Sequence, residues 1–397
     1  MYAHQSLQDL IFLMFYGGTT VLALLAALYL WLRRSNAIAP DVNPPKVLRC
    51  CTATFFMAVV LSHVWWFALG FYWLTDDRLV RNITAVALDH VTLVPLAMAM
   101  LLRMLQDRHR RFWPWVLTQI PIVVLAFIGI AKHDEFYGLE MLHYWEVTVI
   151  VVFVAHYVYA LIRYGRWLHD NYADLEHKEV WQSLLFVVII LIIYEIYTTN
   201  PGEMVREYLA QANTIFIIVF LLWRVETLQQ LEEVIDETIT DCDDEPKSAS
   251  VAVPSNIGAL LHDFCETPKL YLQHDLTLTQ LSEIVGTNRT YLSCYFAQQG
   301  ITYNAYINRL RIEHFERIYN ESSSLMRPIT ANQLAYESGF KSYSTFATAF
   351  KLFKGQTVTY WMKSRNLQKC SCETANYCLL SKNNVPLYIG TESCQKL

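Results

Sequence analysis

The apolar residues of this chain are concentrated in its first 224 positions, where they form long runs. A run of about 20 apolar residues can cross the hydrocarbon core of a bilayer as a helix. We identify seven such runs, at residues 10–32, 50–74, 83–105, 113–131, 143–164, 180–199 and 207–223. The sequence therefore predicts an all-α protein in which residues 1–224 form a polytopic, seven-span transmembrane helical bundle.

The charges between these runs predict the orientation of the bundle. The last residues of the odd-numbered runs and the segments that follow them hold twelve Lys and Arg residues, whereas those of the even-numbered runs hold four. Basic residues accumulate on the cytoplasmic side of a membrane protein. We therefore expect the N-terminus outside and everything after residue 224 in the cytoplasm, an arrangement that requires an odd number of spans.

Several ionisable side chains lie inside the predicted spans, where a charge is costly. Four of them are candidates for a common site: His63, Asp89, Glu146 and Glu195. Such residues usually face the interior of a bundle and pair or bind something. We interpret them as a candidate ligand pocket open to the outer side. The alternative is that they lie near the headgroups, where they are hydrated and have no role.

Residues 225–254 connect the two halves of the chain. Leu228, Leu231, Ile235, Thr238 and Cys242 follow a heptad spacing, which is typical of a coiled coil. A helix that continues from about residue 207 to 242 could transmit a rotation and hold two copies together as a homodimer. An amphipathic helix packed on its own domain explains the spacing equally well. Residues 241–254 resemble a flexible linker, and residues 226–254 hold nine acidic side chains and one lysine.

Residues 255–365 carry two similar helical patterns, each with a glycine at a tight turn. In the first, Leu278, Leu281 and Val285 form one buried face, Gly286 marks the turn, and Asn288 caps a second helix. In the second, the turn lies at Gly339, and a long helix over about 303–319 joins the two patterns. This is the helix-turn-helix spacing that presents a second helix to the major groove of DNA.

The same residues resemble the DNA-binding domain of the AraC/XylS family. The resemblance rests on the motifs Tyr291-Leu292-Ser293-x-x-Phe296, Arg309-Leu310-Arg311-Ile312, Leu334-Ala335-Tyr336-Glu337-x-Gly339-Phe340 and Ser342-x-Ser344-x-Phe346. It covers about 110 residues and implies two recognition helices that read successive segments of the major groove. It also implies contact with RNA polymerase.

Carried over residue by residue, the resemblance implies a set of DNA-binding side chains. They are Arg289, Thr290, Ser293, Cys294, Lys341, Tyr343, Ser344, Thr348 and Lys351. Cys294 and Thr348 stand where the family often has Arg or Lys, so guanine contacts by Arg are missing at both positions. The domain has eleven basic and eight acidic residues, a net charge of +3, which predicts weak, salt-sensitive binding by a single copy.

Nothing in the sequence indicates an enzyme, a cofactor or a metal site. No phosphate-binding glycine loop, nucleophile elbow or metalloprotease helix is present. The tail, residues 366–397, contains Cys370, Cys372 and Cys378 at spacings that match no zinc pair.

Together these features predict a transcription regulator in the inner membrane of a bacterium, which senses an unknown ligand and reads double-stranded DNA in the cytoplasm. Membrane lipid would be its other partner. Two alternatives remain: a transporter with an autoregulatory DNA-binding domain, and a passive membrane tether released by proteolysis.

Overall fold

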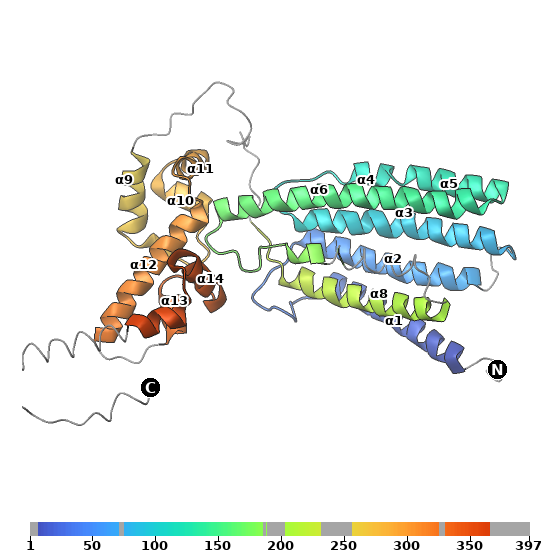
Figure 1. Cartoon of the computed structure of the whole chain (residues 1–397), viewed down its shortest axis with the longest axis horizontal. Helices are drawn as coiled ribbons and strands as arrows, with labels where there is room; N and C mark the ends of the chain where they lie inside the picture. The colour runs from blue at the N-terminus through green and yellow to red at the C-terminus, as the bar shows by residue number, and fades with distance from the viewer. Residues whose placement is uncertain are drawn as a thin grey trace, which may run out of the picture. The chain divides into compact units, whose positions relative to one another are not determined.

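The computed structural model describes residues 7–70, 75–185, 188, 203–231, 256–324 and 330–365. The chain divides into two compact units (Figure 1). The N-terminal unit comprises Met1–Asp170 and Leu175–Ala249, and the C-terminal unit comprises Asn171–Asp174 and Ser250–Leu397. The short segment Asn171–Asp174 therefore belongs to the C-terminal unit, although it comes from the middle of the N-terminal sequence.

The N-terminal unit is built from long helices that lie side by side (Figure 1). They are α1 (Leu7–Leu32), α2 (Lys46–Gly70), α3 (Arg78–Met104), α4 (Trp113–Leu117), α5 (Ile120–Lys132), α6 (Met141–Asn171, preceded by the π-helical turn η1 at Phe136–Glu140) and α8 (Glu203–Thr227). Helix α1 packs against α2 and α8, and α3 packs against α2 and α5.

The described part of the chain contains six helical segments long and apolar enough to cross a membrane. They coincide with six of the seven predicted spans, and the remaining one, at 180–199, lies mostly outside the described residues. The span expected at 113–131 consists of two helices, α4 and α5, with Pro121 in the first turn of α5. Proline lacks the amide hydrogen that a helix interior needs, so it is tolerated at a helix start.

The surface of these helices suits a lipid solvent. In α1, Met14, Val21 and Leu25 are exposed, whereas Ala23 and Ala27 are fully buried. Small residues at a helix contact let two backbones approach closely, which is the usual packing mode inside a bilayer. Large exposed apolar surfaces are unfavourable in water, so this arrangement supports membrane insertion of the N-terminal unit.

The expectation of a continuous helix from about 207 to 242 is wrong, because α8 ends at Thr227 and residues 228–231 are not helical. The last carbonyl groups of a helix need partners, and here side chains from other segments supply them. Asn36 Nδ2 donates to the Glu226 carbonyl at 2.8 Å, and His177 Nδ1 lies 3.0 Å from the Thr227 carbonyl oxygen. These contacts take the acceptors that the next helical turn would use.

The chain just after α8 packs into its own unit. Leu228 and Leu231 are buried, the Gln229 amide donates to His177 O at 2.9 Å, and the Gln230 amide donates to Asn43 O at 2.8 Å. The first two residues of the heptad pattern therefore pack on their own unit. Its remaining positions, Ile235, Thr238 and Cys242, lie outside the described residues.

The C-terminal unit contains two helix-turn-helix patterns joined by one long helix. Its elements are α9 (Ile257–Leu261), η2 (His262–Glu266), η3 (Leu270–Leu272), α10 (Leu278–Val285), α11 (Arg289–Gln298), α12 (Tyr303–Ser324), α13 (Ala331–Glu337) and α14 (Tyr343–Lys354). Residues 358–365 are also helical. One apolar core lies around Leu292 and Phe296, and a second lies around Phe346 and Phe350. Helix α12 contributes residues to both cores.

The two patterns begin with the same local device. Thr277 caps α10 and Thr330 caps α13, and each forms a capping box with the glutamine three residues later. Such a box satisfies two amide groups that the first turn of a helix leaves without partners. The glycines of the two turns, Gly286 and Gly339, have φ angles of +72° and +89°, a region that favours glycine.

Candidate nucleic-acid interface

Helix α11 is the first candidate recognition helix. Asn288 caps it by accepting from the Thr290 amide at 2.9 Å, as expected from the sequence. Leu292 and Phe296 are buried in the core, which turns the other faces of the helix outward. The predicted DNA contacts lie on these faces and are all half-buried: Arg289, Thr290, Ser293 and Cys294. The N-terminal residues of a recognition helix are the ones that reach base edges, and Arg289 is the first residue of α11.

Arg289 is engaged within the unit. Its Nε and one Nη donate to Asn171 Oδ1 at 3.0 and 2.6 Å, respectively. Burial lowers the pKa of the Arg289 guanidinium, and the nearby Tyr172 phenol opposes this shift. The segment that holds Arg289 was not identified from the sequence, because Asn171 lies 118 positions before Arg289 and the segment carries no motif.

Helix α14 is the second candidate recognition helix. Ser342 caps it by accepting from the Thr345 amide at 3.3 Å, and Phe346 and Phe350 anchor it in the second core. The predicted contacts on this helix are all exposed: Tyr343, Ser344, Thr348 and Lys351. The Thr348 hydroxyl donates to Ser344 O at 3.0 Å, so its oxygen still has acceptor capacity.

A shallow depression of about 720 Å³ brings three of these side chains together, namely Tyr343, Thr348 and Lys351. Thr357 and Thr359, which the sequence analysis did not identify, also line it. Lys341, in the turn before α14, lies outside this group and forms an ion pair with Asp275 at 3.3 Å. The sequence signal for the missed residues is the polar stretch that follows Gly355.

A buried arginine fixes the two helix-turn-helix patterns relative to each other. Arg311 of α12 is 1% exposed, and its Nε donates to Tyr271 O and its Nη donates to Gln273 O, each at 2.7 Å. Its guanidinium carbon lies 5.6 Å from the centre of the Phe340 ring. Burial lowers the pKa of this guanidinium. One of the eleven basic residues of the domain is therefore used inside the fold, where it cannot reach a phosphate.

The loop around η3 also contacts the second helix-turn-helix pattern. His274 Nδ1 lies 3.1 Å from Gly339 O, and its ring stands 4.6 Å from that of Tyr336. A Cβ atom at Gly339 would lie 2.8 Å from Leu272 Cα, so the turn of the second pattern touches the backbone of this loop. Helices α11 and α14 are thus held on one rigid frame, as two successive major-groove contacts require.

The candidate ligand pocket of the N-terminal unit remains a prediction, and the structure places its described members in separate networks. The Asp89 carboxylate accepts from Ser62, Trp65 and Trp66 at 2.6, 3.1 and 2.6 Å. The ring of His63 instead lies 3.1 Å from Gln211 Oε1. Glu146 is fully buried, and Glu195 lies outside the described residues.

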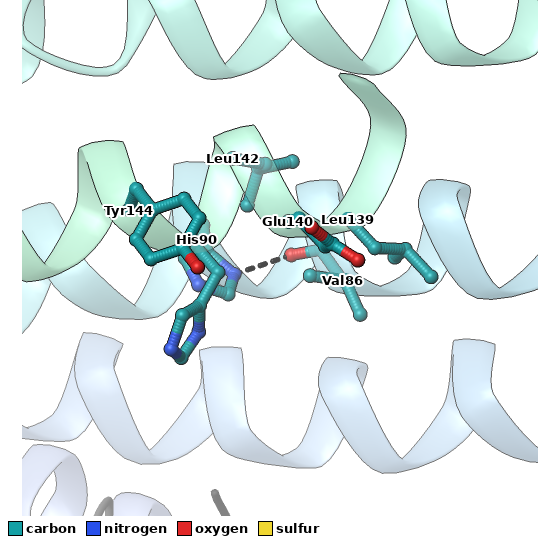
Figure 2. Close-up of a pocket in the computed structure, with 7 residues that line it drawn as sticks. Val86, His90, Leu139, Glu140, Leu142 and Tyr144 are labelled. Carbon is teal, nitrogen blue, oxygen red and sulfur yellow. Dashed lines mark hydrogen bonds between the residues drawn. The ribbon is translucent and has the colours of Figure 1, made fainter. Parts of the chain in front are cut away.

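A different hollow lies between α3 and the start of α6 (Figure 2). It has a volume of about 330 Å³ and is lined by Val86, His90, Leu139, Glu140, Leu142, His143 and Tyr144. His90 Nδ1 donates to Val86 O at 2.6 Å, which orients the ring within this hollow. The sequence analysis pointed to this region only through Asp89, which precedes His90 in the chain.

Comparison with known proteins matches the C-terminal part of the chain to a family. A family model described as a helix-turn-helix domain matches residues 281–364. An uncharacterized HTH-type transcriptional regulator of Staphylococcus aureus (strain MRSA252) is 33% identical over 108 residues, which are 26% of this chain and 14% of that protein. The corresponding regulators of strains COL and N315 are 32% identical over 108 residues, which are likewise 26% of this chain and 14% of each regulator.

The chain thus matches a small fraction of the length of these relatives. No solved structure shows significant similarity to it. The family match and the geometry of α10 to α14 together define the C-terminal unit as a helix-turn-helix domain of the AraC type. This confirms the resemblance expected from the sequence, and the same chain carries the apolar helices of a membrane protein.

Proposed function

We propose that this protein is a membrane-anchored transcription regulator that binds double-stranded DNA sequence-specifically through α11 and α14. One observation carries the proposal: α11 and α14 lie on one frame of two helix-turn-helix patterns, within a chain whose other unit has helices long and apolar enough to cross a membrane. The proposal includes a signal that acts on the membrane helices and alters how the DNA-binding unit is presented.

The proposed location is the inner membrane of a bacterium, because the membrane and the chromosome must then share a compartment. The excess of Lys and Arg after the odd-numbered spans supports an N-terminus outside and a DNA-binding unit in the cytoplasm. Contact with RNA polymerase and pairing of two copies are further parts of this proposal. Two linked copies would compensate for the weak binding expected from a net charge of +3 by raising the effective concentration of the second domain.

The proposal is tested by mapping genome-wide DNA occupancy of the full-length, tagged protein in its native cell. We expect discrete peaks that share a motif, from protein found in the membrane fraction. Thr348→Ala should lower occupancy by about 5- to 150-fold at sites where the threonine contacts a base, since the loss of one matched base position costs about 1–3 kcal/mol.

Thr148→Ala provides the matched control. Thr148 is an exposed threonine of α6 whose hydroxyl donates to the carbonyl four residues earlier at 2.9 Å, as that of Thr348 does at 3.0 Å. It should leave every peak unchanged. A membrane-located protein with no enriched sites, or equal occupancy by the Thr348 variant at all sites, would contradict sequence reading by α14.

A further inference from the structure

The segment Asn171–Asp174, which begins with the last residue of α6, is built into the DNA-binding unit. Tyr172 pairs with Thr277 in an antiparallel β-bridge, and the Ala173 amide donates to Leu276 O at 3.4 Å. On its other side, Asn304 Nδ2 donates to the carbonyls of Tyr172 and Ala173 at 3.1 and 2.8 Å. The unit therefore recognises this segment largely through its backbone.

Burial shows that the segment is an integral part of the unit. Ala173 is fully buried and belongs to the first apolar core, together with Leu276 and Leu292. Asn171, Tyr172 and Asp174 are each less than 10% exposed. A segment held by hydrogen bonds to its main chain and by one small buried side chain resembles a peptide bound to the domain.

The same segment contacts the N-terminal end of α11, where Arg289 lies. Asn171 accepts two hydrogen bonds from the guanidinium of Arg289, the residue best placed on α11 to reach a base edge. A guanidinium that donates its Nε and one Nη to Asn171 cannot present that edge to guanine or phosphate at the same time. A DNA phosphate offers a better acceptor, because it carries a negative charge and can accept two parallel hydrogen bonds from a guanidinium.

We propose that Asn171–Asp174 is an autoinhibitory strap, which competes with DNA for Arg289 and holds α11 in a state with low DNA affinity. This inference rests on the proposed DNA-binding function. The strap begins at Asn171, which is also the last residue of α6. A change in the membrane helices that displaces the strap frees Arg289 and raises the fraction of protein competent to bind DNA.

The test measures DNA binding by the full-length protein in lipid nanodiscs, with a pool of short random-sequence duplexes as the probe. Asn171→Ala removes the acceptor of Arg289 and should lower the apparent Kd about tenfold, since that Kd scales inversely with the competent fraction. Asn304→Ala loosens the strap from its other side and should shift the Kd in the same direction. Asn82→Ala, the same substitution in α3, should leave the Kd unchanged.

Arg289→Ala tests whether the strap lowers DNA affinity through Arg289. It should weaken binding, and adding Asn171→Ala to it should produce no gain, because the two residues act as one pair. Hydrogen exchange gives a second readout: the Ala173 amide should exchange slowly in the free protein and faster once DNA is bound. This readout reports the strap itself and does not depend on the size of the affinity change.

The outcomes separate the two proposals. If Arg289→Ala weakens binding while Asn171→Ala and Asn304→Ala bind like the wild type, the strap is refuted and the DNA-binding function stands. An Ala173 amide that exchanges equally fast with and without DNA also refutes the strap. If neither the wild type nor any variant retains a duplex, the proposed function fails, and the strap fails with it.

Discussion

The contact between Gly339 and Leu272 gives a sharp prediction about how the two helix-turn-helix patterns are held together. Gly339→Ala places a methyl group 2.8 Å from Leu272 Cα and 2.9 Å from its carbonyl oxygen. An alanine in the left-handed region costs about 1–2 kcal/mol, and overpacking against a fixed backbone costs about 1–3 kcal/mol more. We therefore expect the substitution to destabilise the second pattern by about 2–5 kcal/mol.

Gly286→Ala is the matched control, because it carries only the conformational part of the cost. Gly286 has a φ angle of +72°, close to the +89° of Gly339, but a Cβ atom there would meet nothing within 4 Å. It should cost about 1–2 kcal/mol. The difference between the two variants isolates the packing of the turn against the loop around η3.

Hydrogen exchange on the full-length protein in nanodiscs measures both effects, through peptides that cover 331–354 and 278–298. Protection should fall about tenfold for each 1.4 kcal/mol lost. Gly339→Ala should therefore lower protection of the second pattern well beyond the loss that Gly286→Ala causes in the first. Equal losses in the two variants would show that Leu272 does not confine Gly339, and the argument for a rigid frame would then fail.

Two further predictions concern ion pairs of the N-terminal unit. His133 Nε2 lies 2.6 Å from Asp77 Oδ2, and this hydrogen bond raises the pKa of His133 above 6.5 and lowers that of Asp77 below 3.8. The stabilisation by this pair is fully present between about pH 3.8 and 6.5, and it is lost above the His133 pKa or below the Asp77 pKa. Asp77→Asn keeps the helix cap and should return the His133 pKa toward 6.5, as measured by NMR titration. An unchanged His133 pKa would contradict the pairing. Glu226→Ala leaves the buried Arg33, 3.1 Å away, without its carboxylate and should cost about 3–5 kcal/mol, seen as a lower melting temperature in detergent; an unchanged melting temperature would show that the pair contributes nothing.

The parts of the fold that could be predicted are those specified locally. The spans follow from runs of apolar residues, and the caps Thr277 and Asn288 lie directly before the helices that they start. The buried faces of α10, α11 and α14 follow from helical periodicity, because one apolar face must turn to a core. The signal for each of these features lies within a few residues of the feature itself.

The features that could not be predicted depend on partners that are distant in sequence. Helix α8 ends at Thr227 because Asn36 and His177 bind its last carbonyls, and neither side chain can be associated with α8 from the sequence. Arg289 could be identified as a recognition residue, but its partner Asn171 lies 118 positions away. Arg311, placed within a family motif, proves to be fully buried between the two patterns.

The end of α8 at Thr227 has a mechanical consequence. A helix transmits a rotation only as far as its backbone hydrogen bonds continue. In α8 these hydrogen bonds end at Thr227, before the chain leaves the N-terminal unit. Inserting a single residue into an unbroken helix would rotate the residues that follow by about 100°. Where the helix is broken, the orientation of the following residues no longer depends on the number of residues in the helix. A rotation of α8 therefore cannot pass directly into the following residues as a turn of the same helix. Regulation should tolerate the insertion of one to four residues directly after Thr227, because no helical register continues there to be shifted.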